Sequence, residues 1–219
     1  MSFSFALRVV IVGPNLAKEK LFELYKCDGY VNAFLHIRWW HANLEKVAEF
    51  VPKSGTILDL GCGYGFMSNY LALESPERKI LGVELSERKA QYARKGLPNV
   101  NILSKDIMNI NIPPCDAILF LDLLHHLKSY QEQANLLDYC TKMLSPTGTL
   151  IVKEINEEPK LKFLLAFLID NLLYPGDRFY YGSEVVWKLF LEQFGLTVTF
   201  HPIHKGKPLS HVVYVGRIR

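Results

Sequence analysis

Three glycines at alternate positions are the residues of this sequence most suited to holding a ligand. Gly61, Gly63 and Gly65 stand in "LDLGCGYGF", where the first glycine follows an apolar run that contains Asp59. A glycine turn between a strand and a helix lets backbone N–H groups approach a nucleotide cofactor. The dinucleotide fingerprint needs a further glycine where this chain has Phe66, so we expect no binding of NAD or FAD.

Two carboxylates follow at the ends of the next apolar runs. Glu84 ends "KILGVE" and lies 19 residues past Gly65, where a carboxylate can accept the hydroxyls of a ribose. Asp106 ends "VNILSKD", beside the place of an adenine ring. One acidic residue at a strand end is usually only solvated, but three successive strand ends with fitting residues indicate a nucleotide site at the carboxyl edge of a sheet.

Asp122, His125 and His126 follow a fourth apolar run and are candidates for catalysis. A histidine can remove a proton from a hydroxyl acceptor because its ordinary pKa is about 6.5. It can also orient a substrate without moving a proton, or only bond backbone groups at the start of a helix, and these three roles stay open. Because no second carboxylate cluster accompanies the three residues, we expect no metal site.

The elements that position these residues alternate along the chain. Strand-like runs occupy residues 56–60, 79–85, 100–106, 116–122 and 148–155, with helical patterns between them. Residues 196–203 and 211–218 form a closing hairpin-like pair after a helix at 183–195. This rhythm predicts an α/β fold with a Rossmann-like, doubly wound, seven-stranded and mostly parallel sheet, with one antiparallel strand near the C-terminus.

The length of 219 residues fits one domain, which we divide into four parts. They are an N-terminal helical cap (1–54), a cofactor-binding core (55–155), an apolar helical insertion (156–182) and a last helix with the closing hairpin (183–219).

Charge and cysteine content indicate which partners and which cellular compartment to expect. Net charge is only +3 with the basic residues scattered, so we expect no nucleic-acid partner. The four cysteines form no C-x-x-C pair, which favours reduced thiols in the cytoplasm over disulfides or a zinc knuckle. The N-terminal apolar run has no preceding basic residue and no small-residue cleavage site, so we expect no signal peptide, and no run is long enough to span a membrane.

Residues 161–173 are apolar around nearly the whole circumference of a helix, interrupted by Lys162, Asp170 and Asn171. Such a helix is buried, paired or membrane-facing. The leading interpretation is an ordinary core helix. The alternatives are a wall of an acceptor pocket, a dimer contact or a peripheral contact with a membrane.

The segment from about residue 55 to 155 resembles the class I S-adenosylmethionine-dependent methyltransferases. The motifs that carry the resemblance are "LDLGCGYG", "GVELS", "SKDIMNI", "CDAILFLDLLHHL" and "MLSPTGTLIVKE", of which "LLHHL" is similar to the quinone-biosynthesis-like small-molecule group. The resemblance implies S-adenosyl-L-methionine as cofactor. The residues that it implies for cofactor binding are Asp59, Gly61, Cys62, Gly63, Glu84, Leu85, Asp106, Ile107 and Leu121.

The function expected from these residues is methyl transfer to a small, largely apolar acceptor, most often at oxygen. Arg38, in "RWWH", is a candidate for the cofactor carboxylate or an anionic acceptor, or is only a surface charge. By resemblance, His125 faces the acceptor and His126 serves the loop. An RNA or protein methyltransferase and a non-catalytic cofactor-binding module are the alternatives.

Overall fold

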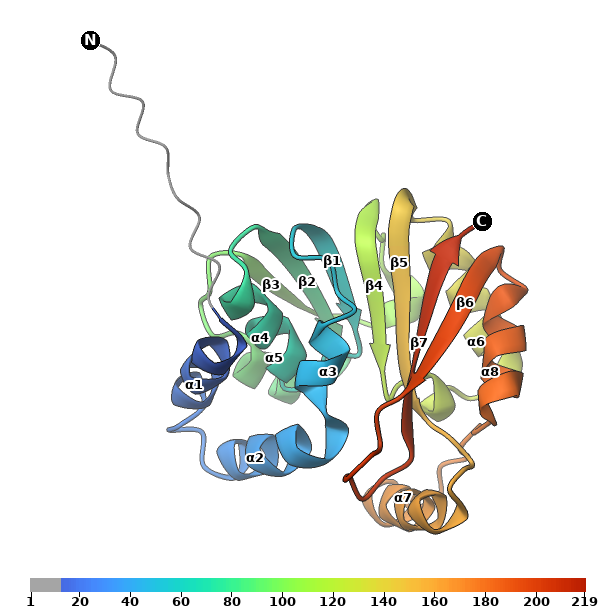
Figure 1. Cartoon of the computed structure of the whole chain (residues 1–219). Coiled ribbons are helices and arrows are strands. Elements are labelled where there is room, and N and C mark those ends of the chain that lie inside the picture. Colours follow the sequence, from blue (N-terminus) through green and yellow to red (C-terminus); the bar gives the residue numbers. More distant parts are fainter. Residues whose placement is uncertain (1–12) are drawn as a thin grey trace.

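The computed structural model describes residues 13–219 and places seven strands in one sheet (Figure 1). The strands are β1 (Gly55–Leu60), β2 (Arg78–Glu84), β3 (Val100–Ser104), β4 (Cys115–Leu121), β5 (Leu144–Ile155), β6 (Leu196–Pro202) and β7 (His211–Ile218). Their spatial order is β3-β2-β1-β4-β5-β7-β6, and β7 runs antiparallel to both neighbours. The predicted fold class is confirmed. The N-terminal run for which we expect no signal peptide lies outside the described residues.

Eight α-helices lie among the described residues. They are α1 (Pro14–Leu24), α2 (Tyr30–Ala42), α3 (Leu44–Ala48), α4 (Phe66–Glu74), α5 (Glu87–Ala93), α6 (Tyr130–Thr141), α7 (Lys160–Leu173) and α8 (Glu184–Glu192). A serine stands before the first residue of each of α5, α6 and α8, and its hydroxyl oxygen accepts a backbone N–H of that helix. These serines are Ser86, Ser129 and Ser183. This capping satisfies one of the N–H groups that each helix start leaves without a partner.

The central strands are buried on both faces of the sheet. Ile57 belongs to a core shared with α1 to α4, whereas its neighbour Leu58 belongs to a core shared with α6 and α8. Because successive side chains of a strand point to opposite faces, one apolar run supplies both cores. This explains why "TILDL" and "DAILFLD" read as almost uninterrupted apolar runs.

The sheet changes direction between β1 and β4. The chain proceeds outward from β1 through β2 and β3 and then returns to place β4 on the other side of β1. Such a switch point leaves a crevice outside the carboxyl ends of the strands, where α/β proteins bind ligands. Figure 1 shows α2 and α7 beyond this edge, below the sheet in the view.

Helix α7 is not a core helix, so the leading interpretation of residues 161–173 is wrong. Ala166 is its only buried residue among those the structure describes, while Leu161, Leu168 and Leu172 are 83%, 56% and 80% exposed. An apolar helix favours an apolar environment, but its sequence does not distinguish the protein core from a pocket, a partner or a membrane surface. In the described part of the chain, no helix is long and apolar enough to cross a membrane.

A buried arginine at the start of β2 pairs with the end of α4 and bonds the segment before β1. The Arg78 guanidinium is fully buried and donates to the Glu74 carboxylate at 2.7 Å. It also donates to the backbone carbonyls of Val51, Pro52 and Leu71. With its donors paired in this way, Arg78 fixes the connection between the helical cap and the sheet.

Replacing Arg78 with Met should lower the free energy of unfolding by about 3–5 kcal/mol, because the buried Glu74 loses its buried partner and keeps only the half-exposed Lys53. The measurement is urea unfolding of the wild type and the variant. The matched control is Lys142→Met, which removes an exposed pair with Asp138 and should change stability far less. Equal effects of the two substitutions would contradict a structural role for the buried pair.

Candidate active site

The glycine turn after β1 uses left-handed backbone at each of its three glycines. Gly61, Gly63 and Gly65 have φ of 69°, 58° and 74°. A Cβ on Gly65 would come within 2.6 Å of the Cβ of Ala93, so this glycine lets α5 approach the turn. A Cβ on Gly63 would meet nothing within 4 Å, which leaves open space above the turn. Gly65 therefore serves packing, whereas Gly63 leaves room for a ligand.

Glu84, at the carboxyl end of β2, lies directly beside this turn. One oxygen of its carboxylate accepts the N–H of Gly63 at 2.9 Å, and the other accepts the N–H of Ser86 at 2.8 Å. The side chain is nearly buried, whereas the next residue, Leu85, is 72% exposed. A carboxylate has about four acceptor sites, so both oxygens of Glu84 keep capacity for hydroxyl donors.

Three other expected cofactor residues are turned into the protein. The Asp59 carboxylate accepts the Ser68 hydroxyl at 2.5 Å, and burial raises its pKa to about 6. Burial also raises the pKa of the Cys62 thiol, which lies near Gly82 of β2. Leu121 is buried at the end of β4. In this structure these three side chains therefore face the protein interior.

Asp106 is exposed at the carboxyl end of β3. Its carboxylate accepts the N–H of Met108 at 2.9 Å and the side-chain amide of Asn109 at 3.1 Å. These bonds cap the short 3-10 helix that contains Ile107 (Ile107–Asn109). Glu84 and Asp106 therefore follow neighbouring, paired strands, as the sequence predicts.

Asp122 lies in a buried ion cluster directly after β4. Its carboxylate accepts Arg38 of α2 at 2.6 Å and Lys153 of β5 at 2.6 Å, and Nε2 of His211 lies 3.5 Å away. Burial alone would raise the pKa of Asp122, but Lys153 and Arg38 hold it well below its usual range. A carboxylate neutralised in this way is a poor proton acceptor. It also occupies Arg38, which the sequence suggested for an anionic ligand.

His125 is bound to Glu154, a residue that the sequence reasoning missed. Nδ1 of the buried His125 ring contacts one oxygen of the Glu154 carboxylate, whose other oxygen accepts the N–H of Leu124 at 2.8 Å. Burial alone would lower the pKa of His125, but Glu154 raises it above the ordinary value. A signal in the sequence is that Glu154 lies near the carboxyl end of a strand-like run, which the structure shows as β5, next to β4.

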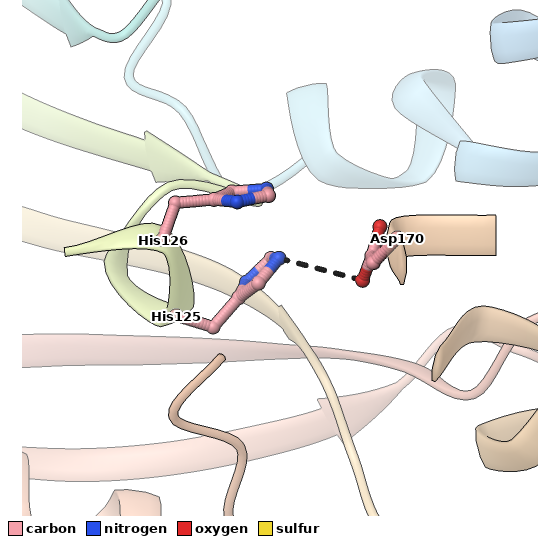
Figure 2. A group of neighbouring side chains, drawn as sticks. All are labelled: His125, His126 and Asp170. Atoms are coloured by element: carbon pink, nitrogen blue, oxygen red, sulfur yellow. Dashed lines mark ion pairs between the residues drawn. The ribbon is translucent and has the colours of Figure 1, made fainter. Parts of the chain in front are cut away.

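Asp170 of α7 reaches the other side of the His125 ring (Figure 2). Its carboxylate lies 3.7 Å from Nε2, a nitrogen with no hydrogen-bond partner in the described part of the chain. Tyr181 donates its hydroxyl to the same carboxylate at 2.6 Å. The sequence marked Asp170 only as an interruption of an apolar helix, and nothing in the spacing connects it with His125.

Aromatic rings enclose the second histidine. The centroid of His126 lies 4.8 Å from that of Tyr174 and 5.3 Å from that of Phe179. Burial, followed by the neighbouring His125, lowers the pKa of His126 to about 3, so the ring is neutral. The segment after α7 therefore forms an aromatic wall beside the histidine pair.

The two halves of the site meet at Leu123. Its side chain lies against Gly61, where an added Cβ would come within 2.8 Å of it. The loop that carries Asp122, His125 and His126 therefore starts against the glycine turn. This arrangement places a nucleotide-type backbone turn and a buried histidine–carboxylate pair next to each other at one edge of the sheet.

Residues 57–148 match a protein family described as Methyltransferase domain. The chain is 32% identical over 110 residues to the trans-aconitate 2-methyltransferase of Methylobacterium nodulans, over 49% of this chain and 42% of that relative. It is 29% identical over 221 residues to the ubiquinone biosynthesis O-methyltransferase of Marinobacter nauticus, over 82% of this chain and 87% of that relative.

For three of its curated relatives the chain spans only about half of their length, namely 42%, 50% and 46%. Among solved structures, the chain is similar to human N-acetylserotonin methyltransferase in complex with S-adenosylmethionine. The TM-score is 0.66 with 17% identity, over 92% of this chain and 59% of that one. At this identity the likeness shows a shared fold.

Replacing Asp122 with Asn should lower the free energy of unfolding at pH 7 by about 3–5 kcal/mol, because Arg38 and the buried Lys153 lose their counter-charge. The folded pKa of Asp122 is depressed, so its stabilisation is present above the unfolded pKa of about 3.9 and is lost as pH falls below it. The variant should therefore lose less stability than the wild type between pH 5 and pH 3.

Urea unfolding at each pH measures both effects. Asp138→Asn, at an exposed aspartate of α6, is the control and should keep the acid dependence of the wild type. A variant at position 122 with unchanged stability at pH 7 would show that the cluster does not hold the edge together.

Proposed function

We propose that this chain, which belongs by sequence and fold to the class I S-adenosylmethionine-dependent methyltransferases, transfers a methyl group to an oxygen atom of a small, largely apolar acceptor. The observation that carries the proposal is that the Gly61–Gly65 turn and the His125–Glu154 pair lie next to each other at the same edge of the sheet. One side suits the cofactor and the other side suits the acceptor.

The cofactor side fits S-adenosyl-L-methionine. Gly63 leaves open space above the turn, and Glu84 keeps acceptor capacity for the ribose hydroxyls. The exposed apolar side chain of Leu85, next to Glu84, offers a surface on which a planar ring can lie. When bound, the cofactor supplies an electrophilic methyl carbon on a sulfonium sulfur that leaves as a neutral thioether.

The acceptor side is apolar and aromatic. Tyr174, Phe179 and Tyr181 surround the histidine pair, and the exposed leucines of α7 continue the apolar surface outward. Catalysis in such a site consists mainly of aligning the acceptor with the methyl carbon and excluding water. Glu154 fixes the ring of His125 so that Nε2 points toward the acceptor side.

Oxygen is favoured by the chemistry of His125 and by the relatives. A buried imidazole nitrogen without a partner suits a hydroxyl group, whose proton must be lost when the oxygen is methylated. Several relatives carry the name ubiquinone biosynthesis O-methyltransferase, which supports the same atom. The four cysteines are free thiols, in agreement with the cytoplasmic location that we propose.

Replacing Glu84 with Gln should weaken binding of S-adenosylhomocysteine at least tenfold, because charge-assisted hydrogen bonds to the ribose are worth about 1.5–3 kcal/mol each. Calorimetric titration gives the affinity. Glu77→Gln, just before the opposite end of β2, is the matched control and should bind as the wild type does. Unchanged affinity at position 84 would reject the ribose assignment.

Transfer of labelled methyl from S-adenosylmethionine should occur with small phenols or hydroxy acids and be absent with RNA or protein extracts. His125→Gln should reduce this transfer by about 10²-fold or more with cofactor affinity nearly kept, because the acceptor oxygen loses its polar contact. His201→Gln, at a histidine of β6, is the control. Transfer into RNA alone, or full activity without the His125 ring, would contradict the proposal.

A further inference from the structure

The contact between His125 and Asp170 is too long for a direct hydrogen bond. Nδ1 of His125 contacts Glu154, and Nε2 faces the Asp170 carboxylate; this nitrogen carries an N–H when the ring is charged and a lone pair when the ring is neutral. The 3.7 Å between Nε2 and the Asp170 oxygen exceeds an N–H···O hydrogen bond of roughly 2.7–3.2 Å. A proton on Nε2 is one group that can lie in this gap, and a metal ion bound between the nitrogen and the carboxylate is the other.

His126 adds a third donor atom on the same side. Figure 2 shows the two histidine rings side by side, with Asp170 opposite them. One ligand atom from each of His125, His126 and Asp170 lies within 4.8 Å of the other two. Two imidazoles and one carboxylate are a donor set that first-row transition metals accept.

The spacing suits a metal ion. Zinc binds nitrogen and oxygen ligands at about 2.0–2.2 Å, which places tetrahedral ligand atoms roughly 3.4 Å apart. Nε2 of His125 and the Asp170 oxygen already stand 3.7 Å apart. From a separation of at most 4.8 Å, the His126 nitrogen needs to move closer by at most roughly 1.4 Å, which a half-buried side chain can do.

The groups behind the donor atoms are also in place. Glu154 holds Nδ1 of His125, the usual arrangement behind a metal-binding histidine. The Tyr181 hydroxyl donates to Asp170 and orients its carboxylate. Glu154 and Asp170 are the two carboxylates beside the proposed ligand atoms, whereas Asp122 is already paired with Arg38 and Lys153.

We propose that His125, His126 and Asp170 bind one divalent transition-metal ion of the zinc type at the acceptor side of the crevice. Three protein ligands leave a fourth position open, which is typical of catalytic rather than structural sites. The sequence favours no metal site because no second carboxylate cluster accompanies Asp122 and the two histidines, and the fold brings Asp170 to them.

The role of the ion rests on the proposed function. A hydroxyl group of the acceptor at the open position has its pKa lowered by the ion and gives its proton to water. A lone pair of that oxygen then forms the bond to the methyl carbon, while the carbon–sulfur bond breaks and its electron pair stays on sulfur. His125 is in this case a ligand that positions the ion.

The first experiment measures binding without turnover. Protein freed of metal with EDTA is titrated with Zn²⁺ by calorimetry in a Cys27→Ser background, because that exposed thiol can bind zinc by itself. We expect one equivalent of Zn²⁺ to bind and Mg²⁺, which prefers oxygen ligands, not to compete. Co²⁺ should give a visible spectrum of nitrogen and oxygen ligation without a thiolate charge-transfer band.

Asp170→Asn and His126→Gln should each weaken Zn²⁺ binding by more than the roughly 10- to 100-fold typical of outer-shell changes. Tyr181→Phe leaves all three ligands in place and should fall within that range. Asp138→Asn and His201→Gln are the matched controls and should bind as the parent does. Circular dichroism tests whether each variant is folded. If a ligand variant is unfolded, weaker Zn²⁺ binding by Tyr181→Phe supports the site, and unchanged binding counts against it.

Equal Zn²⁺ binding by the parent and the ligand variants, or none by the parent, would overturn the site. Nitrogen NMR that finds both nitrogens of His125 protonated in the presence of Zn²⁺ would do the same, since a proton would then fill the gap. Full methyl transfer by metal-free protein would overturn only the role of the ion. Zn²⁺ binding without transfer to any acceptor would count against the proposed function and leave the metal site standing.

Discussion

Asp122 lies buried between Arg38 of α2 and Lys153 of β5, and this ion cluster holds three separate parts of the fold in one place. Removing a carboxylate and two cations from water is costly, so the cluster is stable only while all three members are present. The Asp122 backbone has a φ of 55°, a left-handed value for a residue with a side chain. From this fixed point the chain turns to present His125 and His126.

The cofactor half of the crevice is built mainly from backbone, and the acceptor half from side chains far apart in sequence. The glycine turn, Glu84 and Asp106 each follow their own strand, so the parallel sheet alone aligns them. The environment of His125 instead combines Glu154 of β5, Asp170 of α7 and Tyr181 of the following segment. If one of these elements packed in another position, the groups around His125 would separate. The cofactor half would keep its arrangement, because it depends only on the parallel strands.

Helix α7 joins the acceptor half without belonging to either core. Polar contacts at its inner side include Lys162 with the carbonyl of His204 at 2.6 Å and Asp170 with Tyr181. Its apolar side chains remain largely exposed beside the crevice. Few buried contacts and many exposed ones are features of elements that open locally at low cost. Such an element suits a wall that must let an apolar acceptor enter.

The sequence by itself determined the α/β class, the seven strands, the single antiparallel strand and the residues at the carboxyl ends of β1 to β4. It could do so because strand periodicity, glycine turns and capping serines are local, and a parallel sheet aligns strand ends whatever surrounds them. Only the tertiary structure decided that Arg38 and Lys153 neutralise Asp122, that α7 lies on the surface, and that Asp170 faces His125. These contacts join residues 31 to 84 positions apart, and no local pattern encodes a pairing across that distance.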